Sequence, residues 1–332
     1  MSQKRYAYLI GANGPRTERL VKLKYAEKDA QRLAEALLTP HCSFTKAEAT
    51  TAENPQPTLA GLNRFIKQCE PSDLLLVHFS GHADRGRGGQ LILLCNGTDI
   101  DDYTSSAIKI SSIKEYLDEC KACQKVLILD CCHAGAAHTS PFKGDQDLRG
   151  SLQQTLEGSV NLILSACSYR DRTRELEVLD GGAGFLSWTL IAASTSRFED
   201  VSPDKQSLSL MDIWKWIPTA LQEVNDRLEP KEQLPRPILL NEMIAGHDGE
   251  IWLTERRRAH TSKFVPVMTD IVTKYKARLC LLQTGVGMQT GLHFEAFYVS
   301  WISLWEKYYL QKIGPDLCQK ADSEVNNFVQ GQ

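Results

Sequence analysis

Short apolar runs and amphipathic segments of helical length follow one another along the first three quarters of the chain. The runs are four or five residues long and end at polar or glycine residues, as in the strands of a buried parallel sheet. They predict strands at residues 6–10, 74–78, 91–94, 125–129, 160–164 and 237–240. Between them we expect helices at residues 26–38, 59–69, 111–119, 185–193 and 211–228. This order predicts an α/β fold whose mainly parallel sheet is covered by helices on both faces.

The pattern changes near residue 254. Beyond it the sequence predicts no strand and three helices, at residues 263–283, 293–312 and 315–329. The middle helix carries aromatic residues at spacings of three and four, namely Phe294, Phe297, Tyr298, Trp301, Trp305 and Tyr308. Such a face fits the core of a small helical bundle or a docking surface for a partner protein. We therefore predict an α/β domain at residues 1–254 and a helical regulatory or partner-docking region at residues 255–332.

The bulk composition narrows the class of protein without naming a function. The chain has 332 residues, of which 42% are hydrophobic and 24% charged, as in ordinary globular proteins. A net charge of −3 gives no reason to expect nucleic-acid binding. No apolar stretch approaches the about 18–20 residues of a membrane span, and the first residues hold no signal-peptide core. We expect a cytoplasmic protein without a membrane partner, whose ten cysteines are reduced.

Two motifs directly follow predicted strands and carry the candidate chemistry. Residues 79–82 read Phe-Ser-Gly-His, and residues 130–135 read Asp-Cys-Cys-His-Ala-Gly. Reactive groups of open α/β sheets gather past the carboxyl ends of the strands, so a histidine and a cysteine should meet there. A thiolate assisted by a histidine cleaves peptide bonds, and N–H donors stabilise the oxyanion. The motifs predict a cysteine peptidase with Cys132 as nucleophile, His82 as general acid and base, and the N–H groups of Gly81 and Cys132 as oxyanion donors.

Neighbouring residues compete for these two roles. Cys131 and Cys132 are adjacent, and because successive residues of a strand point to opposite faces, only one of them can face His82. His78 lies inside an apolar run, which is typical of a core residue. His133 follows the candidate nucleophile directly, and we expect it to have a structural role.

At this point the two motifs resemble a known family, the caspase-like peptidases, and in particular their metacaspase and bacterial orthocaspase branch. That branch has one strand ending in Ser-Gly-His and a later strand ending in Asp-x-Cys-His-x-Gly, here residues 80–82 and 130–135. The resemblance extends over residues 5–254 and places Cys132 in the reactive position. It implies a caspase-like fold and a cysteine endopeptidase.

The resemblance also implies cleavage after arginine or lysine. Metacaspases hold the basic side chain in an acidic pocket, and the matching acids here are Asp29 and Asp130, with Ser80 and Ala26 as further wall positions. Two carboxylates suit the forked guanidinium group. Without the resemblance, Asp29 would be interpreted as an exposed helix acid and Asp130 as a helix N-cap acceptor.

Regulation is less clearly marked in the sequence. No cofactor is expected, and calcium dependence stays open because neither residues 101–102 nor residues 171–177 have recognisable ligand spacing. Arginines at positions 170, 172 and 174 suggest the hypothesis that this segment occludes the acidic pocket until activation. Lys143 and Arg149 are candidate self-cleavage points.

Two functional hypotheses from different classes follow. The first is a regulated endopeptidase acting on protein substrates, whose C-terminal helices bind an activator or adaptor protein. Bacterial stress or anti-phage defence is its role by analogy. The second is a catalytically silent caspase-like scaffold, which predicts a missing or displaced catalytic residue. Both His82 and Cys132 are present in complete motifs, which favours the peptidase.

Overall fold

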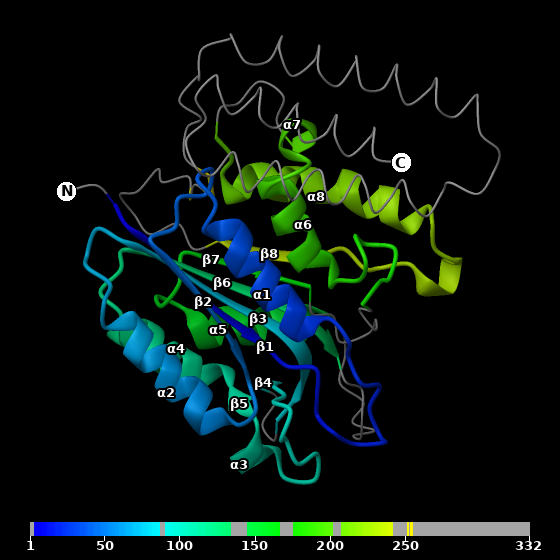
Figure 1. Ribbon diagram of the computed structural model, residues 1–332. Helices are drawn as coiled ribbons and strands as arrows, with labels where there is room; N and C mark the ends of the chain where they lie inside the picture. The colour runs from blue at the N-terminus through cyan, green and yellow to red at the C-terminus, as the bar shows by residue number, and fades with distance from the viewer. Residues whose placement is uncertain are drawn as a thin grey trace, which may run out of the picture. The chain divides into compact units, whose positions relative to one another are not determined.

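The computed structural model describes residues 3–86, 90–133, 145–166, 175–201, 207–241, 251 and 253–254. Within these residues, an eight-stranded sheet carries helices on both faces (Figure 1). The strands are β1 (Arg5–Gly11), β2 (Lys46–Thr51), β3 (Leu74–Arg85), β4 (Leu91–Leu93), β5 (Ile108–Lys109), β6 (Gln124–His133), β7 (Leu162–Ser165) and β8 (Ile238–Asn241). The helices are α1 (Ala26–Leu37), α2 (Pro55–Ile66), α3 (Tyr103–Ser106), α4 (Ile110–Glu119), α5 (Asp145–Leu156), α6 (Phe185–Ser194), α7 (Phe198–Val201) and α8 (Leu210–Asn225), with a 3-10 turn at Pro230–Glu232.

The sheet confirms the predicted topology. The strand order is β2-β1-β3-β6-β7-β8, and every neighbouring pair from β2 to β7 is parallel. Strand β8 pairs antiparallel with β7, while β4 folds back on β3 and β5 on β4. The fold is therefore a mainly parallel sheet covered by helices, as the alternation of apolar runs and amphipathic segments predicts.

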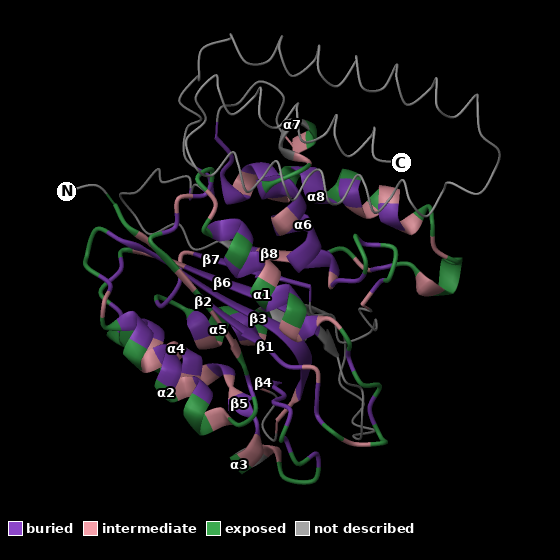
Figure 2. Cartoon of the chain, in the orientation of Figure 1, coloured by how far each residue is buried: buried purple, intermediate pink, exposed green. Residues whose placement is uncertain are grey.

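Two apolar cores lie on opposite faces of this sheet. On β3, Leu74 and Leu76 join the core formed with α1, α6 and α8, whereas Leu75 and Val77 join the core formed with α2, α4 and α5. Figure 2 shows the buried strands between these two helix layers. Each fully buried side chain of this size stabilises the fold by about 1.5–3 kcal/mol. Burial on both faces explains why the central strands are continuous apolar runs.

Among the elements that were not predicted, strand β2 and helix α5 are the longest. Strand β2 pairs with β1 alone at the edge of the sheet, and its residues are half-buried or exposed, so it lacks an apolar run. Helix α5 lies in a stretch for which we predicted no helix, and among its described side chains Leu152 and Leu156 are in the core. Arg149 thus lies in a helix, which must open before a peptidase can cut there. Lys143 is outside the described residues.

Strands β3 and β6 are longer than predicted, and this corrects the position of both motifs. We expected the strands to end at residues 78 and 129, with the motifs in the loops that follow. Instead β3 and β6 pair in register as far as Ala83 and His133, so His82 and Cys132 lie within strands. Polar residues interrupt the apolar run in this extension, although Phe79 and Ala83 are buried in the core, so a search for continuous apolar runs misses it.

The C-terminal region stays a prediction. The chain divides after residue 258, and residues 259–332 are outside the described part of the structure. The three predicted helices and their aromatic face belong to that region. None of the described helices is long and apolar enough to cross a membrane.

Candidate active site

The register of β3 and β6 brings the two motifs side by side. Ser80 pairs with Asp130, and His82 pairs with Cys132. Neighbouring strands are about 4.8 Å apart, and paired positions on parallel strands belong to the same face of the sheet. The two positions predicted for catalysis are therefore direct neighbours on adjacent strands.

The structure separates the two adjacent cysteines. Cys131 is fully buried in the core formed with α2, α4 and α5, so a substrate cannot reach it. Because successive residues of a strand alternate between faces, position 132 belongs to the other face, which α1 and α6 cover. The side chains of Cys132 and His133 are outside the described part of the structure. Cys132 as nucleophile thus stays a prediction, supported by the burial of Cys131.

His82 is held in one orientation by a backbone group. Its side chain is 5% exposed, and its Nε2 lies 2.7 Å from the carbonyl oxygen of Val21, in the segment between β1 and α1. A carbonyl oxygen can only accept a hydrogen bond, so we assign the imidazole proton to Nε2. In the neutral ring Nδ1 is then the basic nitrogen, as a general base requires. Sequence reasoning missed Val21, because a backbone carbonyl leaves no mark on residue type.

The competing histidine is a core residue, as expected. His78 is fully buried, and its Nε2 is 3.0 Å from the hydroxyl oxygen of Ser187 on α6. Burial lowers the pKa of His78 to about 3, so its imidazole stays neutral at physiological pH.

The two predicted pocket acids meet at the N-terminus of α6. Asp29 is 0% exposed and Asp130 is 7% exposed. The Oδ2 atom of Asp29 accepts a hydrogen bond from the Gly184 N–H at 2.8 Å, and the Oδ2 atom of Asp130 accepts one from the Ser187 N–H at 2.7 Å. A Cβ on Gly184 would lie only 2.5 Å from the Asp130 carboxylate, so this approach requires glycine. The structure thus brings both acids to one place.

This arrangement bears on the alternative interpretations of the two acids, namely an exposed helix acid for Asp29 and a helix N-cap acceptor for Asp130. Asp29 is not an exposed helix acid, since it is fully buried. Asp130 does accept from the first turn of α6, as the N-cap alternative anticipated. Asp29 nevertheless keeps one oxygen unmatched: its buried Oδ1 has no hydrogen-bond partner among the described residues. An unmatched buried polar atom costs about 1–3 kcal/mol, which a donor on a bound ligand would relieve.

The two remaining wall positions border the acids. Ser80 is buried and pairs in register with Asp130. Ala26 is buried at the first position of α1, three residues before Asp29 and hence on the same side of the helix.

A third acid, Glu175, was missed by the sequence analysis. Its carboxylate accepts hydrogen bonds from the N–H groups of Lys24, Tyr25 and Ala26, at 2.6, 2.7 and 2.9 Å. It therefore caps α1, whose own N-cap side chain makes no such bond. Burial raises the pKa of Glu175, and repulsion from Asp130 adds to the shift. No local signal could reveal this cap, because the partners are far apart in sequence.

The buried groups give the site a defined pH dependence. Burial raises the pKa of Asp29 from 3.8 to about 8, and repulsion by Asp130 and Glu175 acts in the same direction. Between these values the folded chain binds more protons at Asp29 than the unfolded chain, so stability falls as pH rises. His78 acts oppositely, because below its ordinary pKa of 6.5 the unfolded chain binds more protons. The two effects oppose each other below pH 6.5, and above it the effect of Asp29 remains.

We expect the free energy of unfolding to fall by on the order of 1–2 kcal/mol between pH 6.5 and 8. Asp29→Asn should remove much of that fall, as measured by denaturant unfolding at several pH values. Glu177→Gln is the matched control, because that carboxylate is exposed and paired with Lys24 at 2.9 Å. A slope unchanged by Asp29→Asn would contradict the assignment of the titrating group.

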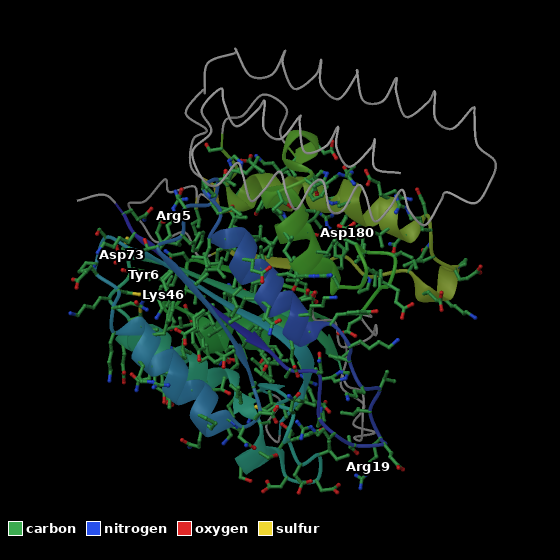
Figure 3. All side chains as sticks on the ribbon, viewed as in Figure 1. Arg5, Tyr6, Arg19, Lys46, Asp73 and Asp180 are labelled. Atoms are coloured by element: carbon green, nitrogen blue, oxygen red, sulfur yellow. The ribbon has the colours of Figure 1, made fainter. Side chains whose placement is uncertain are left out.

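Metal binding gains no support from the described residues. In that part of the chain, no three His, Cys, Asp or Glu side chains are grouped so as to hold a metal ion. Asp101 is exposed and forms an ion pair of 2.8 Å with Arg19, which is labelled in Figure 3. The three arginines at positions 170, 172 and 174 are all outside the described residues. Calcium dependence and pocket occlusion stay open.

A helix-covered parallel sheet with a histidine and a cysteine paired on adjacent strands is the arrangement expected of a caspase-like peptidase. The sequence matches the caspase domain family over residues 4–275. The chain therefore belongs to this family, which is one of cysteine peptidases. The match extends past the domain end predicted at residue 254. A search of curated protein sequences found no match.

Among the solved structures to which the chain is similar are two of a caspase-1. Caspase-1 from Spodoptera frugiperda is 12% identical over 72% of this chain and 86% of its own, with a TM-score of 0.48. Its pro-form is 11% identical over 72% and 87%, with a TM-score of 0.45. A protein from Geobacter sulfurreducens is 14% identical over 72% and 94%, with a TM-score of 0.41.

Proposed function

We propose that this chain is a cysteine endopeptidase that cleaves protein substrates after arginine or lysine, with Cys132 as nucleophile and His82 as general acid and base. The observation that carries the proposal is the register of β3 and β6, which pairs these two positions directly. Membership of the caspase domain family supports the peptidase activity. The buried acid pair, Asp29 and Asp130, supports the preference for a basic residue at P1.

The proposed reaction uses the residues in a fixed order. Nδ1 of His82 takes the thiol proton of Cys132, and the thiolate attacks the carbonyl carbon of the scissile peptide. The N–H groups of Gly81 and Cys132 stabilise the oxyanion. The imidazolium then protonates the leaving amine, and water, deprotonated by His82, hydrolyses the thioester. The carbonyl of Val21 holds the ring throughout, because both protonation states keep a proton on Nε2.

Gly81 has a packing reason for being glycine as well as a proposed catalytic one. A Cβ at this position would lie 2.8 Å from the ring of Phe79 and 3.0 Å from the carbonyl oxygen of Ala12. The role of its N–H as an oxyanion donor rests on the resemblance, and on its place next to His82 in β3.

The acid pair suits a basic side chain at P1. The unmatched Oδ1 of Asp29 is a buried acceptor, and a guanidinium can donate to two carboxylates at once through its fork of N–H groups. A cation beside Asp29 would also lower its raised pKa, so binding would release a proton near neutral pH.

The proposal extends to regulation through the C-terminal region. We expect residues 255–332 to bind an activator or adaptor protein, and the aromatic face of the predicted helix at 293–312 supports this. A role in stress or anti-phage defence rests on analogy with bacterial caspase-like proteins. The alternative of a silent scaffold is not favoured, since the catalytic positions are paired rather than displaced.

Cleavage of peptides that differ only at P1 tests the proposed specificity. With arginine, lysine, leucine or aspartate at P1, we expect kcat/KM to be about a hundredfold higher for the two basic residues. The same panel with and without calcium determines whether the ion is needed. Cleavage after aspartate would contradict the acidic pocket and its preference for a basic P1 residue, but would be compatible with peptidase activity. No cleavage, together with no labelling of Cys132 by a thiol-reactive probe, would contradict the peptidase itself.

A further inference from the structure

The carbonyl that holds His82 belongs to the long connection between β1 and α1, here called the Val21 segment and defined as residues 12–25. The segment is closed on itself by the Leu23 N–H, which donates to the Asn13 carbonyl at 3.0 Å. Leu20 is buried in a small apolar cluster with Ile92. Since the segment is neither helix nor strand, these contacts and its anchors determine where the Val21 carbonyl points.

A polar anchor at the start of the segment is Asn96, which follows β4 and is 5% exposed. Its side-chain oxygen accepts a hydrogen bond from the Gly14 N–H at 2.7 Å, and its backbone carbonyl accepts one from the Arg16 N–H at 3.2 Å. A Cβ on Gly14 would lie 2.5 Å from the Cα of Asn96. The segment and Asn96 are therefore in backbone contact, which requires glycine at position 14.

The amide nitrogen of Asn96 makes two further bonds. It donates to Oε1 of Glu27 at 3.0 Å and to Oε1 of Glu53 at 2.9 Å. Glu27, in the first turn of α1, also accepts from the Asn13 N–H at 3.3 Å and donates its own N–H to the side chain of Asn13 at 3.2 Å. Asn96 thus joins the start of the Val21 segment to α1, with both amide hydrogens and the amide oxygen in use.

We propose that Asn96 is a positioning residue for His82. It fixes the Val21 segment so that the Val21 carbonyl holds the imidazole with its proton on Nε2 and directs Nδ1 to the reacting thiol. The inference rests on the proposed function, because it concerns the same histidine. An aspartate cannot replace the asparagine: it lacks both N–H donors and sets a third carboxylate against Glu27 and Glu53.

Nuclear magnetic resonance of the full chain with ¹⁵N-labelled histidine tests the proposal, with the His82 signals assigned from a His82→Gln variant. We expect Asn96→Ala and Asn96→Asp to reduce the population with the proton on Nε2. They should also lower kcat for an arginine peptide about tenfold, with KM changed less than about twofold. Asn225→Ala is the matched control, because that amide also fixes a loop, accepting from the Leu234 N–H at 2.7 Å and donating to its carbonyl at 3.1 Å. It should lose stability and keep both the tautomer and kcat.

A folded Asn96→Asp variant with the wild-type His82 tautomer would overturn the inference. If the single variants do not fold, the exchange Asn96→Asp with Glu27→Gln restores a donor opposite the new carboxylate, and we expect it to regain the wild-type tautomer. A folded exchange variant without that tautomer would also overturn the inference. If the wild-type chain cleaves no peptide and a thiol-reactive probe does not label Cys132, the proposed function fails, while the tautomer measurement still decides the role of Asn96.

Discussion

Replacing Cys132 with alanine is expected to lower kcat for an arginine peptide by at least about 10⁴-fold, because the thiolate that forms the covalent intermediate is lost. His82→Ala should cause a loss of similar size, since the two groups act as one unit. Steady-state cleavage by the purified chain measures both losses. Thiol-probe labelling of each variant, located by mass spectrometry, shows which cysteine reacts.

The neighbouring cysteine provides the control. Cys131→Ala removes a thiol from the core on the opposite face, so it should cost on the order of 1 kcal/mol in stability and leave kcat within about twofold. The two variants differ by a single position in β6, which makes the comparison sharp. Loss of cleavage in Cys131→Ala together with full cleavage in Cys132→Ala would reverse the assignment of the nucleophile.

The second large effect is expected from the buried acids. Asp29→Asn and Asp130→Asn each keep the size of the side chain and remove a carboxyl group that would carry a negative charge beside the bound cation. We expect kcat/KM for arginine and lysine peptides to fall about a hundredfold. In each variant the buried P1 cation keeps one carboxylate partner and loses its ion pair with the other. Peptides with an uncharged P1 residue should be cleaved as slowly as before. Measuring the P1 panel with each variant gives this difference directly.

Asp212 separates specificity from stability in this experiment. It is also a buried carboxylate at a helix N-terminus: in α8 it accepts from the Ser209 N–H at 2.9 Å and completes a capping box. Asp212→Asn should destabilise the fold by about 1 kcal/mol and leave the P1 preference unchanged. If all three variants changed the P1 preference to the same extent, the effect of the two pocket acids would be on stability and not on specificity.

Much of this protein follows from local patterns in its sequence. The apolar runs of β3 and β6 predict a buried parallel sheet because both faces of these strands are covered. The motifs at residues 79–82 and 130–135 predict a cysteine peptidase, because a histidine and a cysteine near the carboxyl ends of parallel strands lie at the same edge of the sheet. The acids Asp29 and Asp130 were found through the resemblance, because neither has a local signal of its own.

Other features depend on contacts between distant parts of the chain. Strand β2 shows no apolar run because it is an edge strand. The Val21 carbonyl and the three N–H groups bonded by Glu175 are backbone groups, which every residue carries, so residue type cannot point to them. The sequence by itself thus determined the sheet, the motifs and the family. Only the tertiary structure decided how His82 is held and where the two acids meet, because hydrogen bonds and burial depend on which groups folding brings together.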